Sequence, residues 1–134
     1  MRQPLLLTLF FLFFACQKED PSPCSLLVSS WRCTSWLENE QERMAPGGTI
    51  SSVVCRMEPL GSDGQGRFNW TALYTSGGTE IFEGKYSVDA SCALIRFTPT
   101  GQTSFSLASV VEKKKWSLEG SLNGKQVRIV WEPY

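Results

Sequence analysis

Cysteine offers the widest chemistry in this chain of 134 residues, because the sequence contains no histidine. The absence of imidazole excludes Ser-His-Asp and Cys-His nucleophile systems and the usual histidine-containing metal sites. None of the five cysteines has the close Cys-x-x-Cys spacing of a metal site, and no residue that would activate a thiol is evident. We therefore predict no catalytic residues, no metal and no cofactor, in a protein that is not an enzyme.

Aromatic residues could form a second kind of site, one that binds an apolar ligand. Trp70 and Tyr74 share one face of an alternating segment, and Phe82 and Tyr86 share one face of the next. Their rings could line a pocket, with the hydroxyl groups as polar anchors. The alternative is that the four rings fill a small core, as aromatic stripes at strand spacing usually do.

The N-terminal residues indicate export. Arg2 gives one positive charge, and residues 5–14 form an apolar run interrupted only by Thr8. A run of about ten residues is half the length that a membrane-spanning helix needs. A basic start, a short apolar stretch and small residues after it are typical of a secretory signal peptide. The alternative is a buried N-terminal strand or helix.

The residues that follow carry a resemblance to bacterial lipoproteins. Ala15 directly before Cys16 resembles a lipobox, in which the peptidase cuts before the cysteine and the sulfur receives a diacylglycerol. Residues 17–20 (QKED) resemble the export signal of surface lipoproteins of Bacteroidota, the alternative being a charged tether. The resemblance implies a signal peptide at 1–15, a lipidated tether at 16–24 and a domain at 25–134. It also implies acyl chains such as palmitate on Cys16, and an outer-membrane location on the cell surface or the periplasmic face.

Four cysteines remain in the exported chain, an even number for an oxidising compartment. Two disulfides are expected, and four cysteines allow three pairings. If the first two strands form a hairpin centred near residue 43 or 44, Cys33 and Cys55 lie nearly opposite each other. Cys24 would then bond to Cys92.

The rest of the chain reads as strands separated by glycine turns. We predict eight strands, near 27–37, 49–58, 67–75, 79–88, 92–98, 103–111, 114–122 and 125–132. Residues 38–48 form the longest polar connection, either a flexible loop or one helical turn. The fold class is therefore all-β, an antiparallel up-and-down barrel of about eight strands. Equal numbers of basic and acidic residues, 13 each, argue against a nucleic-acid partner.

The last hairpin can be predicted residue by residue. Asn123-Gly124 is the favoured dipeptide of a two-residue type I′ turn, because both positions need a positive φ. Trp116 would then face Trp131, and Glu119 would face Arg128 on the opposite side of the sheet.

The domain also resembles a family. The LLVSSW stretch at 26–31 and the GSDGQG turn at 61–66 are similar to elements of the lipocalin-like lipoproteins of Bacteroidota. The resemblance implies that Trp31 lies at the closed end of the barrel, where Arg128 could cover its ring by a cation–π contact. The alternative is a core Trp31 and a solvated Arg128; the hairpin pair Glu119–Arg128 is favoured over the cover.

Two functions remain open. One is a membrane-anchored, lipocalin-like barrel that binds a small, mostly apolar ligand. The other is a non-enzymatic interaction module with a filled barrel in an outer-membrane complex. A cavity among the aromatic rings would favour ligand binding, whereas a packed interior with an exposed apolar patch would favour the module.

The lipid anchor gives the first testable prediction. Cys16→Ser removes the sulfur to which the diacylglycerol is attached, so the variant should incorporate no labelled fatty acid when it is expressed in a host that processes lipoproteins. Labelling of the variant at the level of the wild type would contradict the lipoprotein interpretation.

Overall fold

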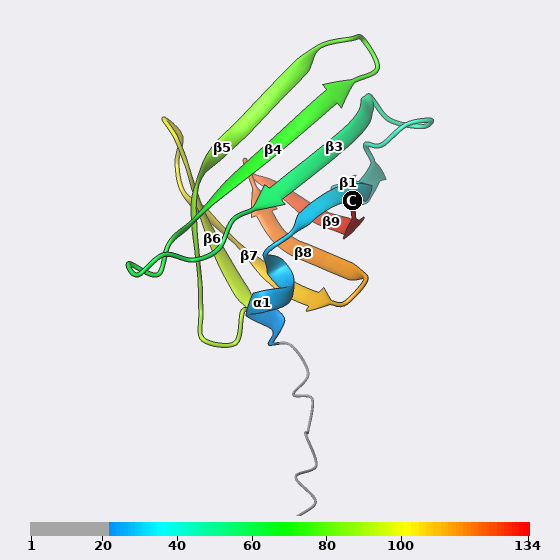
Figure 1. Cartoon of the computed structure of the whole chain (residues 1–134). Coiled ribbons are helices and arrows are strands. Elements are labelled where there is room, and N and C mark those ends of the chain that lie inside the picture. The colour runs from blue at the N-terminus through cyan, green and yellow to red at the C-terminus, as the bar shows by residue number, and fades with distance from the viewer. Residues whose placement is uncertain (1–21) are drawn as a thin grey trace, which may run out of the picture.

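The computed structural model describes residues 22–134, and these form one closed antiparallel barrel behind a short helix (Figure 1). The predicted signal peptide and Cys16 lie outside the described residues. The elements are α1 (Pro23–Leu27), β1 (Ser30–Glu38), β2 (Gln41–Glu42), β3 (Ile50–Met57), β4 (Gly66–Tyr74), β5 (Thr79–Val88), β6 (Leu94–Pro99), β7 (Phe105–Glu112), β8 (Lys115–Leu122) and β9 (Lys125–Pro133). Strands β3 to β9 pair in chain order, and β1 closes the barrel by pairing with both β3 and β9. The predicted all-β barrel is confirmed.

The alternation that predicted the strands also places the core. Along β4, Phe68 and Trp70 point inward and are almost fully buried, whereas Arg67, directly before Phe68, is exposed. Every strand from β3 to β9 contributes such inward residues, because every second side chain of a strand points to the same face of the sheet. The sequence reading did not predict α1 or β2.

Strand β1 pairs with β3 and β9 at the same time at only two residues. Ser30 to Arg32 pair with β3, and Trp31 and Arg32 pair at the same time with the end of β9. The register with β9 shifts between Cys33 and Ser35, which marks a β-bulge. Beyond this bulge β1 continues along β9 and no longer pairs with β3.

Residues 41–45 span the gap that opens between β1 and β3. The N–H of Arg43 donates to the carbonyl of Trp36 on β1, 2.8 Å away, and the N–H of Ala45 donates to Ile50 on β3, also at 2.8 Å. This segment is thus a short strand followed by a bridge to β3, rather than the flexible loop or helical turn that we expected.

The C-terminal hairpin has the predicted register. Asn123 and Gly124 have φ angles of 51° and 75°, and Leu122 pairs with Lys125. Trp116 pairs with Trp131 inside the barrel, where the rings stack with centroids 5.6 Å apart. Outside, Arg128 Nε donates to Glu119 Oε1 at 2.6 Å.

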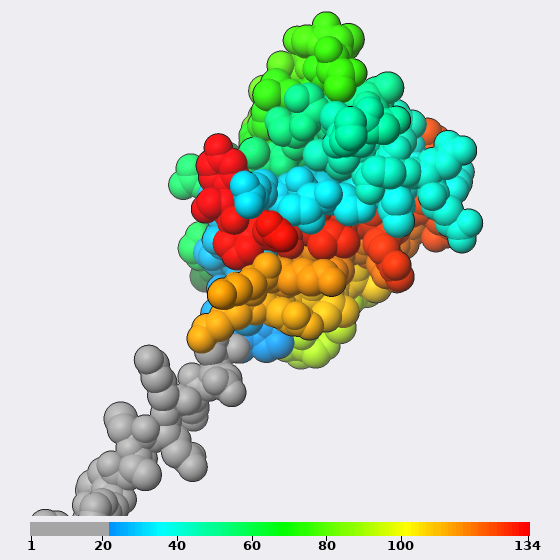
Figure 2. All heavy atoms as spheres, turned by 90° about the vertical axis from the view of Figure 1, so that its right-hand side faces the viewer, coloured from blue at the N-terminus to red at the C-terminus, as the bar shows by residue number. Residues whose placement is uncertain are grey.

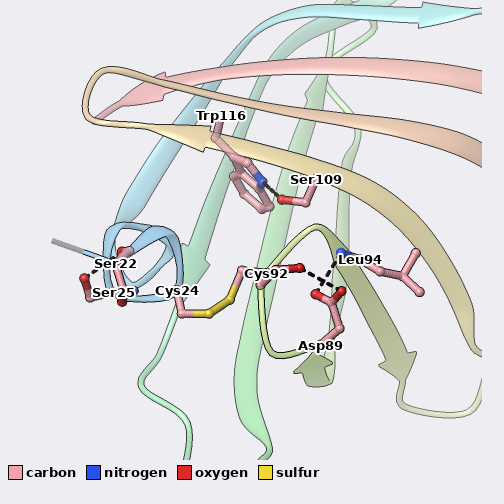
Figure 3. The surroundings of a disulfide bond; sticks show 9 residues. Ser22, Cys24, Ser25, Asp89, Cys92, Leu94, Ser109 and Trp116 are labelled. Atoms are coloured by element: carbon pink, nitrogen blue, oxygen red, sulfur yellow. Dashed lines mark hydrogen bonds between the residues drawn. A yellow bond between two sulfur atoms is a disulfide. The ribbon is translucent and has the colours of Figure 1, made fainter. Parts of the chain in front are cut away.

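Helix α1 covers one end of the barrel (Figure 1), and Figure 3 shows the disulfide that joins it to the barrel. Ser22 caps the helix by accepting the N–H of Ser25 on its hydroxyl, and Leu27 is fully buried. A disulfide joins Cys24 of α1 to Cys92, between β5 and β6. The predicted Cys24–Cys92 bond is therefore present, and the end of the predicted tether lies in α1 against the barrel.

The predicted Cys33–Cys55 disulfide is absent, and both cysteines are free and buried. The physical reason is register. Cys55 pairs with Trp31 rather than with Cys33, and the pairing of β1 with β3 ends at Arg32, so Cys33 has no partner residue on β3.

The disulfide generates a stability prediction. Replacing Cys24 and Cys92 by alanine frees a loop of 68 residues in the unfolded chain, which should lower the free energy of unfolding by about 2–4 kcal/mol. Thermal or urea unfolding measures the difference. A reductant should lower the stability of the wild type to that of the double variant and leave the variant unchanged. A further loss in the variant would show that Cys33 and Cys55 are also bonded.

Candidate functional site

The two ends of the barrel differ, and only one is open. Helix α1 lies at the end where β1 begins, and Trp31 there is buried and donates its indole N–H to the carbonyl of Leu27 at 3.0 Å. At the opposite end the hairpin of β4 and β5 projects past the other strands (Figure 2). The open end therefore lies between this hairpin, the bridge at 41–45 and the turn between β8 and β9.

A cavity of about 240 Å³ occupies the open end. Its walls come from the last residues of β1 and β4, the first residues of β3 and β5, and the turn from β8 to β9, namely Trp36, Glu38, Arg43, Ile50, Val53, Trp70, Ala72, Tyr74, Glu80, Phe82, Leu122, Asn123 and Lys125. The mouths of β-barrels are a usual place for small-molecule sites. The size of this cavity suits a small ligand.

Three of the four aromatic residues proposed from the sequence line this cavity. Trp70, Tyr74 and Phe82 lie on its walls. Tyr86 does not; it is buried nearer the closed half, and its hydroxyl donates to the carbonyl of Glu58 at 2.5 Å. Burial raises the pKa of Tyr86 to about 12. Gly66 opposite Tyr86 leaves the space for that ring, because a Cβ on Gly66 would lie 2.4 Å from it. Tyr86, which we predicted as a ligand contact, therefore does not line this cavity.

The aromatic walls pack on one another before any ligand arrives. Trp36 meets Trp70 edge to face with centroids 5.9 Å apart, and Trp70 meets Phe82 at 5.8 Å. The indole N–H of Trp36 is buried without an acceptor among residues 22–134. The N–H of Trp70 has only the sulfur of Cys55 beside it, which is a weak acceptor. A buried donor left unpaired costs about 1–3 kcal/mol.

Charged groups surround the mouth of the cavity. Glu38 accepts both Arg43, at 3.2 Å, and Lys125, at 3.1 Å, so one carboxylate is shared by two cations. On the other side the hydroxyl of Tyr74 donates to Glu80 at 2.5 Å. This hydrogen bond to Glu80 raises the pKa of Tyr74, so the phenol stays protonated at neutral pH.

Glu42 fixes the bridge that forms one wall. Its carboxylate accepts the hydroxyl of Ser35 at 2.6 Å and the backbone N–H groups of Trp36 and Met44, both at 2.9 Å. Burial acts to raise the pKa of Glu42, but these hydrogen bonds outweigh it and hold the pKa below its ordinary value of 4.5. Glu42 thus joins the bridge to the part of β1 that has left β3.

Sequence reasoning missed the residues that come from β1 and the bridge. Trp36 lies in a predicted strand, but strict alternation from Trp31 would place it on the outer face. The bulge moves every later residue to the opposite face and so turns Trp36 inward. Residues 36–43 (WLENEQER) contain aromatic and charged residues that line the cavity. Nothing in this stretch of sequence shows which of them lie together at the mouth.

A larger hollow of about 640 Å³ lies on the outer face of β3, β4 and β5. Its walls are mainly charged and polar, with Arg56, Arg67 and Lys85 beside Glu58 and Glu83. Small-molecule sites usually have mostly apolar walls with a few polar groups, whereas the walls of this solvent-facing hollow are mainly polar. We therefore take the smaller aromatic cavity as the candidate site.

The two free thiols lie below the cavity and are inert. Burial raises the pKa of Cys33 to about 12 and raises that of Cys55 well above its ordinary value. Both thiols therefore stay protonated at neutral pH. Among residues 22–134 there is no group of three or more cysteine or carboxylate side chains that could hold a metal ion.

Arg128 does not cover Trp31. It is paired with Glu119 on the outside of the barrel, while Trp31 lies inside against Trp116, with centroids 5.6 Å apart. The favoured hairpin pair is therefore confirmed and the cation–π cover is absent.

Comparison with known proteins shows the fold alone. No protein-family model and no curated protein matches the chain. A redesigned β-barrel matches with a TM-score of 0.58 and 12% identity over 84% of this chain and 95% of that one. A de novo designed fluorescence-activating β-barrel matches with a TM-score of 0.56 and 8% identity over 86% of this chain and all of that one. Within residues 22–134 no helix is long and apolar enough to cross a membrane.

The contacts of Glu42 predict a pH-dependent contribution to stability. Glu42→Gln should lower the free energy of unfolding by about 1 kcal/mol near neutral pH, a small figure because the side chain is exposed. The folded-state pKa is lowered, so the carboxylate stabilises the fold above its ordinary pKa and this contribution is lost as the pH falls through the lowered value. The gap between wild type and variant should therefore narrow in acid, as measured by urea unfolding at several pH values.

The neighbouring Glu40 provides the control, because it is an exposed glutamate on the same segment. Glu40→Gln should change the stability little at any pH. An equal loss in both variants would mean that the charge of the segment matters, and not the hydrogen bonds of Glu42.

Proposed function

We propose that this protein is a lipid-anchored envelope protein whose barrel binds a small, mostly apolar ligand at its open end. The anchor rests on the sequence, from the apolar run before Cys16 and the charged residues after it. The binding function rests on the cavity at the mouth.

One observation carries the proposal, the buried and unpaired indole N–H of Trp36 on the cavity wall. Most buried polar groups in folded proteins have a partner, and a polar ligand atom or an ordered water is the usual one when the protein offers none. The aromatic walls would contact the apolar part of the ligand, and the N–H of Trp36 would donate a hydrogen bond to an acceptor atom of the ligand.

The charges at the mouth agree with a ligand that has an acceptor. Arg43 and Lys125 share the single carboxylate of Glu38, so each retains donor capacity toward the opening. The proposed role is binding without chemistry.

The filled-barrel alternative is supported less well. Below the mouth the interior is indeed packed, with Trp116, Leu118 and Ile129 fully buried. This packing limits the ligand to the open end and leaves the cavity there intact.

The test uses the ligand that the protein carries and a defined probe. Native mass spectrometry of protein purified from its own envelope should show a bound small molecule. Nitrophenol, a small aromatic compound with acceptor oxygens, should quench tryptophan fluorescence in a saturable way. Trp36→Phe keeps an aromatic ring and removes the donor, so it should weaken binding about five- to tenfold.

Trp131→Phe is the matched control. Its indole N–H is also buried without a partner, but Trp131 does not line the cavity. This variant should bind the probe like the wild type once its fold is confirmed by circular dichroism. Equal loss of binding in both variants, or unsaturable quenching in the wild type, would contradict a site at the mouth.

A further inference from the structure

Four cations form a diagonal line on the outer face of the barrel, across the neighbouring strands β3 to β6. Arg67 on β4 pairs directly with Lys85 on β5. Arg56 on β3 pairs with Asn69 and is therefore the diagonal neighbour of Arg67. On the other side, Arg96 on β6 is the diagonal neighbour of Lys85. All four cations are exposed, and because strands lie about 4.8 Å apart, this basic stripe extends over about 15 Å.

The basic stripe has no counter-ions of its own. None of its members forms an ion pair with a carboxylate among residues 22–134. The ion pairs of this part of the chain use four other cations, namely Arg32, Arg43, Lys125 and Arg128. Like charges directly opposite each other destabilise a strand pair, so the placement of Arg67 beside Lys85 costs stability. A bound anion would offset this cost.

Most of the stripe lies in the outer hollow of about 640 Å³ described above. Arg56, Arg67 and Lys85 are in the walls of this hollow, and Asn69 and Thr100 add uncharged polar groups. Cations that line a concave surface act together on one bound molecule. The hollow is therefore built for a ligand that carries more than one negative charge.

Two carboxylates in the same walls restrict the ligand further. Glu58 lies opposite Arg67, with its backbone N–H donating to the carbonyl of Arg67 at 2.9 Å, and Glu83 lies on the other side of the stripe. Glu83 accepts the side-chain amide of Asn69 at 3.1 Å rather than a cation. Ionised carboxylates only accept hydrogen bonds. A ligand that suits this hollow thus has donors, such as hydroxyl groups, beside its negative charges.

We propose that the outer hollow and the basic stripe bind an acidic oligosaccharide, a chain of sugars that carry carboxylate groups, along the line from β3 to β6. The arginine side chains pair with the sugar carboxylates, a geometry in which guanidinium groups bind two oxygens at once. Hydroxyl groups of the sugar rings donate to Glu58 and Glu83. A nucleic acid matches the hollow less well, because it has a phosphate at every nucleotide and would place phosphates beside these two carboxylates.

Three probes test the assignment by isothermal titration calorimetry on the purified full-length chain. Tetragalacturonate, which has both carboxylates and hydroxyl groups, should bind saturably and more weakly as the salt concentration rises, because salt screens exposed charges. Maltotetraose has hydroxyl groups but no charge and should not bind. A single-stranded oligonucleotide should bind more weakly than tetragalacturonate.

Substitutions at the centre of the stripe separate binding from folding. Arg67→Gln and Lys85→Gln should each weaken the binding of tetragalacturonate about tenfold, because each removes a charged hydrogen-bond donor. Each also removes the repulsion between β4 and β5 in the free protein, so the melting temperature should equal or exceed that of the wild type. A purely structural role of these cations would lower it.

Lys114→Gln is the matched control. Lys114 is an exposed lysine in the turn between β7 and β8, outside the stripe, so its replacement changes the net charge equally. This variant should bind tetragalacturonate like the wild type. Trp36→Phe should also leave this binding unchanged, so that the outer hollow and the aromatic cavity are tested separately.

The proposal would be overturned by a wild type that shows no saturable binding of tetragalacturonate, or that binds maltotetraose equally well. An equal loss of binding in Lys114→Gln and Lys85→Gln would overturn it too, because net charge alone would then explain the binding. Tighter binding of the oligonucleotide than of tetragalacturonate would show that the stripe recognises a nucleic acid and not a sugar.

Discussion

A strand has only two edges, and the organisation of this barrel depends on how β1 uses them. At Trp31 and Arg32, β1 pairs with both β3 and β9 and closes the barrel. After the bulge it continues along β9 and pairs on its other side only with the two residues of β2, so β3, β4 and β5 project past the other strands. The cavity lies inside the opening that results, and the first half of β5, which pairs with β4 alone, is the far border of the same projection. The candidate site therefore depends on one early separation of two strands.

Residues 41–45, which connect the separated strands β1 and β3, are held in place by few groups. Glu42 collects three hydrogen bonds and fixes the bridge between β1 and β3. The bridge in turn presents Arg43 to the mouth, where Glu38 connects it to Lys125 at the start of β9. Polar contacts therefore complete the open end, whereas tryptophan stacking and α1 complete the other.

Local chemistry made much of the fold predictable. The Asn123-Gly124 turn fixed the register of β8 and β9, and glycine turns with alternating aromatic residues located most other strands. The predictions that failed concern contacts between segments far apart in the sequence. No pattern in the sequence shows that β1 has a bulge or that residues 41–45 form a bridge, so Cys33 was paired with Cys55 and Trp36 was overlooked as a cavity residue. Alternation placed Tyr86 inside correctly but could not give its depth, which depends on the space over Gly66.

The position of α1 determines which way the opening faces. The disulfide holds Cys24, and with it the point where the N-terminal segment joins the domain, at the end opposite the mouth. A chain attached to a surface through that segment stands with its closed end toward the surface. The aromatic cavity then faces the surrounding water, and a ligand enters or leaves without passing between the domain and its support. The Cys24–Cys92 disulfide thus determines from which end of the barrel the N-terminal segment leaves the domain.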